Sequence, residues 1–356
     1  MKTLLFTMEY PPFKGGVANY YHNLEKNWPE AGSFKVLFKK YSLNPWQYLL
    51  YWQDLYRAVK TEKVDYILAG QILPLGSVVY LFSRLFHKPY AVVLHGMDFP
   101  LALVNVRKRF LTKMILGRAN KIFCSNSYVA QLVKDFSLNL GQKIVVVNPG
   151  ASDLLAVDPP RIEELKQQYN LVDKKVIITI GRLVKRKGVD TMLSALEFLG
   201  REKISGWRYV VLGAGPDEVY LKDLCRQRGL DNLVTFVRPV SEADKWAWLN
   251  LCDLFAMPTR NLAGDFEGFG IVYLEANLAG KPVLATGSGG VADAVLNGTN
   301  GFLIDSDKVK DLALSLEKLM NNYDLRNYLG QKGRFRVETE FNWKTQAKKI
   351  YLEINS

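Results

Sequence analysis

The chain has 356 residues, 48% of them hydrophobic and 23% charged, and this length predicts two domains rather than one core. It contains no apolar run of the roughly 18 residues that a membrane helix needs, no signal-peptide pattern and only three cysteines, too far apart for a disulfide framework or a zinc site, so we expect a cytoplasmic protein. Residues 1–150 carry 19 Lys and Arg against 8 Asp and Glu, and therefore hold nearly all of the net charge of +12. A basic half of this kind attracts an anionic substrate, an anionic membrane or a nucleic acid. The alternative is that these cations only form a solvated surface.

Short apolar runs rich in β-branched residues alternate with longer amphipathic stretches along the whole chain. In the first half, the predicted strands cover residues 3–7, 36–38, 66–69, 91–94, 121–124 and 144–147. In the second half, they cover residues 176–180, 209–212, 234–237, 254–257, 283–285 and 301–304. Strands that alternate with helices form parallel sheets with right-handed crossovers. The pattern therefore predicts an α/β fold with two Rossmann-like, doubly wound domains.

The alternation breaks between residues 148 and 160, where Asn148-Pro149-Gly150 and Asp158-Pro159-Pro160 interrupt it. We therefore place the domains at residues 1–155 and 156–339. The last helix, within residues 340–356, can belong to either half, and packing back on the first domain is one of these two options.

The most informative motif covers residues 265–275, Asp-Phe-Glu-Gly-Phe-Gly-Ile-Val-Tyr-Leu-Glu, and follows a predicted strand. We expect it to enter a helix at about Phe269, where glycines let backbone N–H groups approach a ligand and the helix N-terminus favours a phosphate or a sugar oxygen. Glu267 comes just before this helix, and Glu275 projects from its largely apolar body, which is costly without polar partners. The alternative is that Glu267 only complements the helix dipole and Glu275 is an exposed helical residue.

A basic loop, Gly181-Arg-Leu-Val-Lys-Arg-Lys-Gly188, follows the strand at residues 176–180. At the carboxyl end of a parallel strand, Arg182 and Lys187 are placed to bind a diphosphate, whereas Lys185 and Arg186 are expected to face water. A solvated basic loop is the alternative interpretation.

Three further features are weaker. The loop at residues 11–17 contains Gly15-Gly16 and follows the first strand, so Gly16 can admit a phosphate or a sugar. His95 ends the strand at residues 91–94, although a lone histidine is more often structural. Gly213-Ala-Gly-Pro216 lacks the third glycine of a dinucleotide fingerprint, which argues against a nicotinamide oxidoreductase.

Together these motifs resemble family four of the retaining glycosyltransferases, and the stretches 257–260 and 270–275 look especially like phosphatidylinositol mannoside mannosyltransferases. The resemblance covers nearly the whole chain. Its most specific element is the pair Glu267 and Glu275, with seven residues between them, and Gly15-Gly16, His95-Gly96 and Asn148-Pro149-Gly150 also match. It implies the GT-B fold, in which two Rossmann-like domains face each other across a deep cleft.

The resemblance also implies a role for each matching residue. Glu275 would bind the ribose hydroxyls of the donor nucleotide, and Glu267 would face the transferred sugar. Arg182 and Lys187 would neutralise the diphosphate in place of a metal, and His95 would contact the donor sugar. The backbone around the glycines would approach the donor at Gly16, Gly268, Phe269 and Gly270.

These implications predict a metal-independent, cofactor-free enzyme that moves a hexose from a nucleotide-diphosphate sugar with retention of configuration. GDP-mannose is the leading donor; a UDP-hexose is the first alternative, and a non-catalytic sugar-binding relative is the second. Arg238-Pro239 stands where relatives often have glycine, and residues 261–264 form an insert. The identity of the donor base and the shape of the sugar pocket are therefore left undecided. A nucleic-acid-binding protein would not explain the paired glutamates, and we expect no nucleic acid partner.

The acceptor is expected to be a glycan or a lipid-linked molecule. Residues 45–56 carry five aromatic rings, and residues 104–118 carry five Lys and Arg, a combination that suits peripheral contact with the inner face of an anionic membrane. Helix packing for the aromatic rings and a solvated face for the cations is the alternative.

Overall fold

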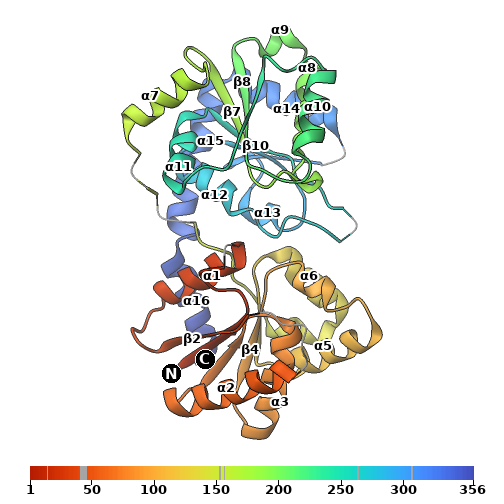
Figure 1. Cartoon of the computed structure of the whole chain (residues 1–356), viewed down its shortest axis with the longest axis vertical. Coiled ribbons are helices and arrows are strands. Elements are labelled where there is room, and N and C mark those ends of the chain that lie inside the picture. The colour runs from red at the N-terminus through yellow and green to blue at the C-terminus, as the bar shows by residue number, and fades with distance from the viewer. Residues whose placement is uncertain (14, 41–45, 152–153, 156, 263, 306–307) are drawn as a thin grey trace. The chain divides into compact units, whose positions relative to one another are not determined.

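The computed structural model describes the whole chain except residues 14, 41–45, 152–153, 156, 263 and 306–307. The chain forms two compact units (Figure 1). Unit 1 contains Met1–Gly150 and Asn342–Ser356, and unit 2 contains Ala151–Phe341.

Unit 1 is built on a six-stranded parallel sheet with the order β2-β1-β3-β4-β5-β6. Its strands are β1 (Thr3–Thr7), β2 (Phe34–Phe38), β3 (Tyr66–Ala69), β4 (Tyr90–Leu94), β5 (Lys121–Cys124) and β6 (Ile144–Val146). The helices are α1 (Gly16–Lys26), α2 (Trp46–Glu62), α3 (Ser77–Phe86), α4 (Asp98–Leu101), α5 (Val106–Arg118), α6 (Ser127–Phe136) and α16 (Trp343–Asn355), with the short turns η1 (Ile72–Gly76) and η2 (Leu138–Lys143).

The C-terminal helix α16 belongs to unit 1 because its apolar side chains complete the unit 1 core. Trp343, Ala347 and Ile350 are buried in one cluster with side chains of α1 and of the sheet. The Asn342 side chain caps this helix by accepting a hydrogen bond from the Thr345 backbone N–H at 2.8 Å.

Unit 2 repeats this architecture with the strand order β12-β11-β10-β7-β8-β9, all parallel. Its strands are β7 (Lys175–Ile180), β8 (Trp207–Leu212), β9 (Val234–Val237), β10 (Leu254–Met257), β11 (Val283–Thr286) and β12 (Gly301–Ile304). The helices are α7 (Pro159–Gln168), α8 (Val189–Leu199), α9 (Arg201–Ile204), α10 (Glu218–Gln227), α11 (Glu242–Leu251), α12 (Ile271–Leu278), α13 (Val291–Ala294), α14 (Val309–Asn321) and α15 (Tyr323–Glu340), with the turn η3 (Lys185–Lys187).

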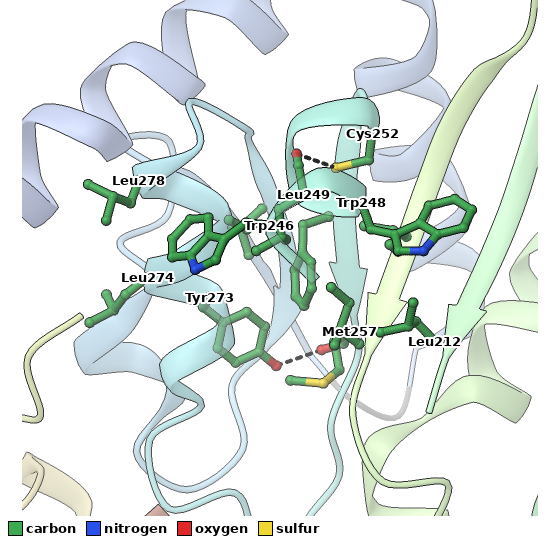
Figure 2. Close-up of a cluster of buried hydrophobic side chains, with 14 of the residues drawn as sticks. Leu212, Trp246, Trp248, Leu249, Cys252, Met257, Tyr273, Leu274 and Leu278 are labelled. Carbon is green, nitrogen blue, oxygen red and sulfur yellow. Dashed lines mark hydrogen bonds between the residues drawn. The ribbon is translucent and has the colours of Figure 1, made fainter. Parts of the chain in front are cut away.

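A large buried cluster fixes α11 and α12 against this sheet. Figure 2 shows Trp246 and Trp248 of α11 together with Tyr273 and Leu274 of α12. The Tyr273 hydroxyl donates to the Met257 carbonyl at 2.7 Å, so the first turn of α12 is tied to the carboxyl end of β10. The motif at residues 265–275 is therefore held by the core.

The predicted fold class is confirmed, and each predicted strand end lies within two residues of the observed one. The domain boundary differs from the prediction, since it lies after Gly150 rather than after residue 155, and again after Phe341 rather than after residue 339. A side chain on Gly150 would collide with Trp343 at 2.7 Å, whereas the Ala151 N–H donates to the Phe341 carbonyl at 2.8 Å. Close packing thus assigns Gly150 to unit 1, and a hydrogen bond assigns Ala151 to unit 2.

One further prediction is corrected. The helix after Gly270 begins at Ile271 and not at about Phe269, because Gly270 has a left-handed backbone with φ of 79°. Within α2, Tyr51 is buried, and Trp52 stacks with Tyr56 and packs against Phe86, which supports the alternative of helix packing for these three rings. Among the described helices, none combines the length and apolarity needed to cross a membrane.

Candidate functional site

A buried carboxylate with two cationic partners lies at the carboxyl edge of the unit 2 sheet. Lys187 Nζ is 2.7 Å from Glu267 Oε2, and the Arg186 guanidinium pairs with the same oxygen. Arg186 Nε also lies 3.0 Å from Asp265 Oδ1. The loops that follow β7 and β10 are therefore linked by salt bridges at Asp265 and Glu267.

Both cations act on the ionisation of Glu267, whose side chain is only 11% exposed. Burial by itself would raise the pKa of Glu267, but Lys187 and Arg186 together lower it below its ordinary value. Glu267 is consequently a fixed anion at neutral pH.

Three glycines allow the backbone around this cluster to approach so closely. A side chain on Gly188 would lie 1.8 Å from the Pro258 carbonyl oxygen, and one on Gly289 would lie 2.2 Å from the Glu267 carbonyl oxygen. A side chain on Gly270 would lie 2.5 Å from the Tyr273 ring. The basic loop and the Glu267 loop therefore meet only because these positions carry no side chain.

Glu275 has a different partner in the same unit. Lys245 of α11 bridges Glu275 Oε1 at 2.8 Å and Glu242 Oε2 at 2.7 Å. Burial alone would lower the pKa of Lys245, but Glu275 and Glu242 raise it above its ordinary value. Because Glu275 is buried and paired, the alternative of an exposed helical glutamate is wrong.

A cavity of about 330 Å³ lies beside this bridge, at the ends of β7, β8 and β9. Its walls combine backbone and apolar side chains with three charged residues: Ile180, Gly181, Arg182, Leu212, Gly213, Ala214, Pro239, Val240, Glu242 and Lys245. Arg182 and Lys187 thus share a loop but work at different places. Arg182 lines the cavity, whereas Lys187 contacts Glu267.

Phe269 and Gly268 complete the motif. The Phe269 side chain is buried against Phe341, so only its backbone can meet a ligand. Part of the insert lies outside the described residues, namely residue 263, as does residue 14 of the Gly15-Gly16 loop. Gly16 itself begins α1 and is exposed.

His95 lies in unit 1, at the carboxyl end of β4. The Tyr21 hydroxyl donates to the Gly70 carbonyl at 2.6 Å, so at 2.8 Å from that hydroxyl His95 Nε2 must be the donor. Burial lowers the pKa of His95 to about 3. The imidazole is therefore neutral at physiological pH, with Nδ1 as a hydrogen-bond acceptor.

The sequence prediction missed one residue of these sites and misplaced another. Arg186 was expected to face water, which is wrong, because Asp265 and Glu267 neutralise it. Lys245 was not identified. Lys245 stands 30 residues from Glu275, a separation that no local motif connects.

Comparison with known proteins supports one family. The family model for glycosyl transferases of group 1 matches residues 161–336. The chain is 36% identical over 259 residues to the GDP-mannose-dependent alpha-(1-6)-phosphatidylinositol monomannoside mannosyltransferase of Mycobacterium tuberculosis, a match that covers 72% of this chain and 66% of that relative. It is 25% identical to the same enzyme of Mycolicibacterium smegmatis, over 98% of this chain and 96% of that relative.

Solved structures agree on the fold. Anabaena Alr3699/HepE in complex with UDP superposes with a TM-score of 0.82 at 20% identity, covering 100% of both chains. WaaG, a glycosyltransferase involved in lipopolysaccharide biosynthesis, superposes with a TM-score of 0.70 at 17% identity, covering 99% of this chain and 100% of that chain. The chain therefore belongs to the group 1 glycosyl transferases and has the GT-B fold.

Proposed function

We propose that this chain is a retaining, metal-independent glycosyltransferase that moves mannose from GDP-mannose to a hydroxyl group of a glycan or a lipid-linked acceptor. The observation that carries the proposal is the cluster of Lys187, Arg186 and Glu267 at the start of α12. The names of the mycobacterial relatives support the donor.

The chemistry requires charge compensation at the leaving group. When the bond between the anomeric carbon and the phosphate oxygen breaks, negative charge builds up on the diphosphate. Arg182 and Lys187 stabilise this charge in place of a metal ion. The acceptor oxygen then bonds to the anomeric carbon from the same face, and its proton passes to the leaving phosphate, so configuration is retained.

The cavity beside Arg182 suits a purine diphosphate. Leu212, Pro239 and Val240 supply apolar walls for a flat base. Glu275 pairs with Lys245, which lines the cavity, and its carboxylate would meet the ribose hydroxyls from there. Glu242 places a carboxylate, which only accepts hydrogen bonds, at the same cavity. Guanine presents an N–H and an amino group side by side, whereas uracil presents a single N–H, so Glu242 favours GDP over UDP.

Membrane contact is the last part of the proposal. On α5, Val106 is 84% exposed and Phe110 is 63% exposed. They alternate with Arg107, Lys108, Arg109 and Lys113, and the helix contains no acidic residue. Exposed apolar side chains favour an anionic lipid surface when they lie among cations that, within the described part of the chain, have no salt bridge. We place this surface on the cytoplasmic face because the three cysteines are free and buried.

The test uses the purified chain with EDTA present throughout. We expect GDP to raise the melting temperature more than UDP does, and Glu242→Gln to remove most of that difference. Transfer from GDP-mannose should yield the α-anomer by NMR. A β-linked product would refute retention, activity lost in EDTA and restored by a metal would refute metal independence, and GDP binding without turnover on any acceptor tried would favour the non-catalytic alternative.

A further inference from the structure

Two cations of one turn share a single carboxylate oxygen in unit 2, and they differ in how they are held. Within the described part of the chain, Lys187 has a salt bridge only with Glu267, at 2.7 Å. Arg186 pairs with the same oxygen of Glu267 and also lies 3.0 Å from Asp265. A planar guanidinium can bridge two carboxylates, whereas the ammonium of a lysine is a point charge on a flexible stem. Arg186 is therefore suited to stay in place, and Lys187 is suited to change its partner.

Lys187 also lies close to the cavity that we assign to the donor. A side chain on Gly181 would lie 3.3 Å from Lys187 Cε and 3.6 Å from Lys187 Nζ. Gly181 lines the cavity together with Arg182. The ammonium group of Lys187 thus contacts Glu267 and is near the cavity wall. A diphosphate bound at this wall would compete with Glu267 for it.

The backbone of the turn that carries both cations is held by Arg260. The Arg260 N–H donates to the Arg186 carbonyl at 2.8 Å, and the Arg260 guanidinium donates to the Lys185 carbonyl at 2.6 Å. The same guanidinium is anchored by both carboxylate oxygens of Asp190, at 3.0 and 2.9 Å. A change of partner is therefore made by the Lys187 side chain and not by movement of the turn.

The cost of releasing Lys187 depends on Arg186. Glu267 is buried, and taking away the last partner of a buried carboxylate is strongly unfavourable. Burial opposes the ionisation of Glu267, but Lys187 and Arg186 together hold its pKa below the ordinary value. Because Arg186 remains paired with it, Glu267 keeps one cation when Lys187 leaves.

We propose that Arg186 is a positioning residue that keeps Glu267 compensated while Lys187 turns from Glu267 to the diphosphate of the donor. This inference rests on the proposed transferase function and extends it to the way in which two neighbouring cations divide their work. Arg186 does not contact the donor and acts through Glu267 and Lys187. Donor binding exchanges one salt bridge of Lys187 for another, and the buried carboxylate is never left without a cation.

The experiment is a double-mutant cycle on Arg186 and Glu267, with the Kd of GDP measured by isothermal titration calorimetry in EDTA. GDP has the diphosphate but no sugar, so the role proposed for Glu267 towards the sugar does not enter. Arg186→Gln should weaken GDP binding by about tenfold, because Lys187 is then the last cation of Glu267. Glu267→Gln should bind GDP at least as tightly as the unaltered chain. The double variant should bind it as tightly as Glu267→Gln does, since a neutral side chain no longer retains Lys187.

Three comparisons separate this role from a general effect of charge or stability. Lys185→Gln removes a positive charge from an exposed position of the same turn, and it should bind GDP nearly as tightly as the unaltered chain. Arg186→Lys keeps a cation beside Glu267 and should recover most of the affinity that Arg186→Gln loses. Guanosine, which has no phosphate, should bind Arg186→Gln as it binds the unaltered chain, a result that loss of packing would not produce.

The results also separate the inference from the function on which it rests. If Arg186→Gln binds GDP as tightly as the unaltered chain, or if the double variant binds GDP about tenfold more weakly than Glu267→Gln, the inference is wrong and the donor assignment stands. The second comparison decides even where Arg186→Gln does not fold, because neither of its two variants has a carboxylate at position 267. If GDP fails to bind the unaltered chain, the proposed function itself is wrong.

Discussion

The pairing of Glu267 with Lys187 and Arg186 sets what single substitutions can do at the candidate site. Removing one cation leaves a buried carboxylate with a single partner, which costs more than losing an exposed pair. The same substitution also removes a positive charge that the proposed leaving group needs. Stability and activity are therefore expected to fall together here, but by different amounts.

Lys187→Ala is expected to lower kcat/KM for mannose transfer by about 100-fold or more. It should also lower the free energy of unfolding by about 2 kcal/mol, measured with urea. Lys185→Ala is the matched control, because Lys185 lies in the same turn with an exposed side chain. A Lys187→Ala enzyme with nearly full activity would remove this lysine from the site.

The pH dependence of stability is expected to report on His95. Because burial lowers its pKa to about 3, below the ordinary 6.5, its contribution to stability is complete above pH 6.5 and is lost as the pH falls towards 3. In the unaltered chain, His95 should therefore make the unfolding free energy fall by about 1.4 kcal/mol for each pH unit as the pH is lowered from about 6 to about 4. The His95→Gln variant should lack this fall. Urea unfolding across this range measures it.

Asp98 provides the opposite sign in the same experiment. Its pKa is raised to about 6, so its contribution is complete below its ordinary value of 3.8 and is lost as the pH rises through about 6. Asp98→Asn should accordingly stabilise the chain more at pH 7 than at pH 4. Identical pH profiles for the unaltered chain and both variants would contradict the burial of these two groups.

At the scale of single elements, the start of α12 depends on Gly270, which has a left-handed backbone and no room for a side chain. Gly270→Ala would add strain at φ of 79° and a collision with Tyr273 at 2.5 Å. Gly280 has φ of 74° but nothing within 4 Å of its side-chain position, so Gly280→Ala measures the backbone strain alone. We expect Gly280→Ala to cost about 1 kcal/mol in unfolding free energy and Gly270→Ala to cost clearly more, with loss of transfer activity. Equal costs would show that the site tolerates a side chain here.

Helix α5 is the element expected to bind lipid. Replacing Arg107, Lys108 and Lys113 by Gln removes three charges, each worth about 1 kcal/mol near an anionic surface, so binding to phosphatidylglycerol vesicles should fall by about 100-fold. Phosphatidylcholine vesicles should bind weakly in either case. The control replaces Lys310 and Leu314, which are exposed on α14 of unit 2. Vesicle binding that depends equally on both helices would argue against a specific surface.

At the scale of the whole molecule, unit 1 is built from two separate stretches of the sequence, because α16 follows unit 2 in the sequence but completes the core of unit 1. Deleting residues 342–356 would remove Trp343, Ala347, Ile350 and Ile354 from the unit 1 core, each worth roughly 1–3 kcal/mol. We expect unit 1 to lose its protection in hydrogen exchange while unit 2 stays folded and binds GDP. Leu352→Ser, at an exposed position of the same helix, should leave unit 1 intact.

The sequence by itself determined the two α/β units, their strands and the glycine-rich and basic loops of the candidate site. These features arise from local periodicity and from residues a few positions apart, and the positions of strand ends follow from where apolar runs stop. Placing Arg182, Lys187 and Glu267 in loops after strands of one half, and Glu275 on the helix that follows, was possible for the same reason. The assignment of these residues to a donor remains a prediction that the resemblance supports.

The tertiary structure alone decided which charged groups are partners. Arg186 was predicted to face water, yet it pairs with Glu267, 81 residues away, because Gly188 lets its loop lie against Pro258. Lys245 meets Glu275 only because the tryptophans of α11 and Tyr273 of α12 pack in one core. Local patterns fix where helices and strands occur, but ion pairs and burial depend on contacts between distant segments, and those contacts exist only after the chain has folded.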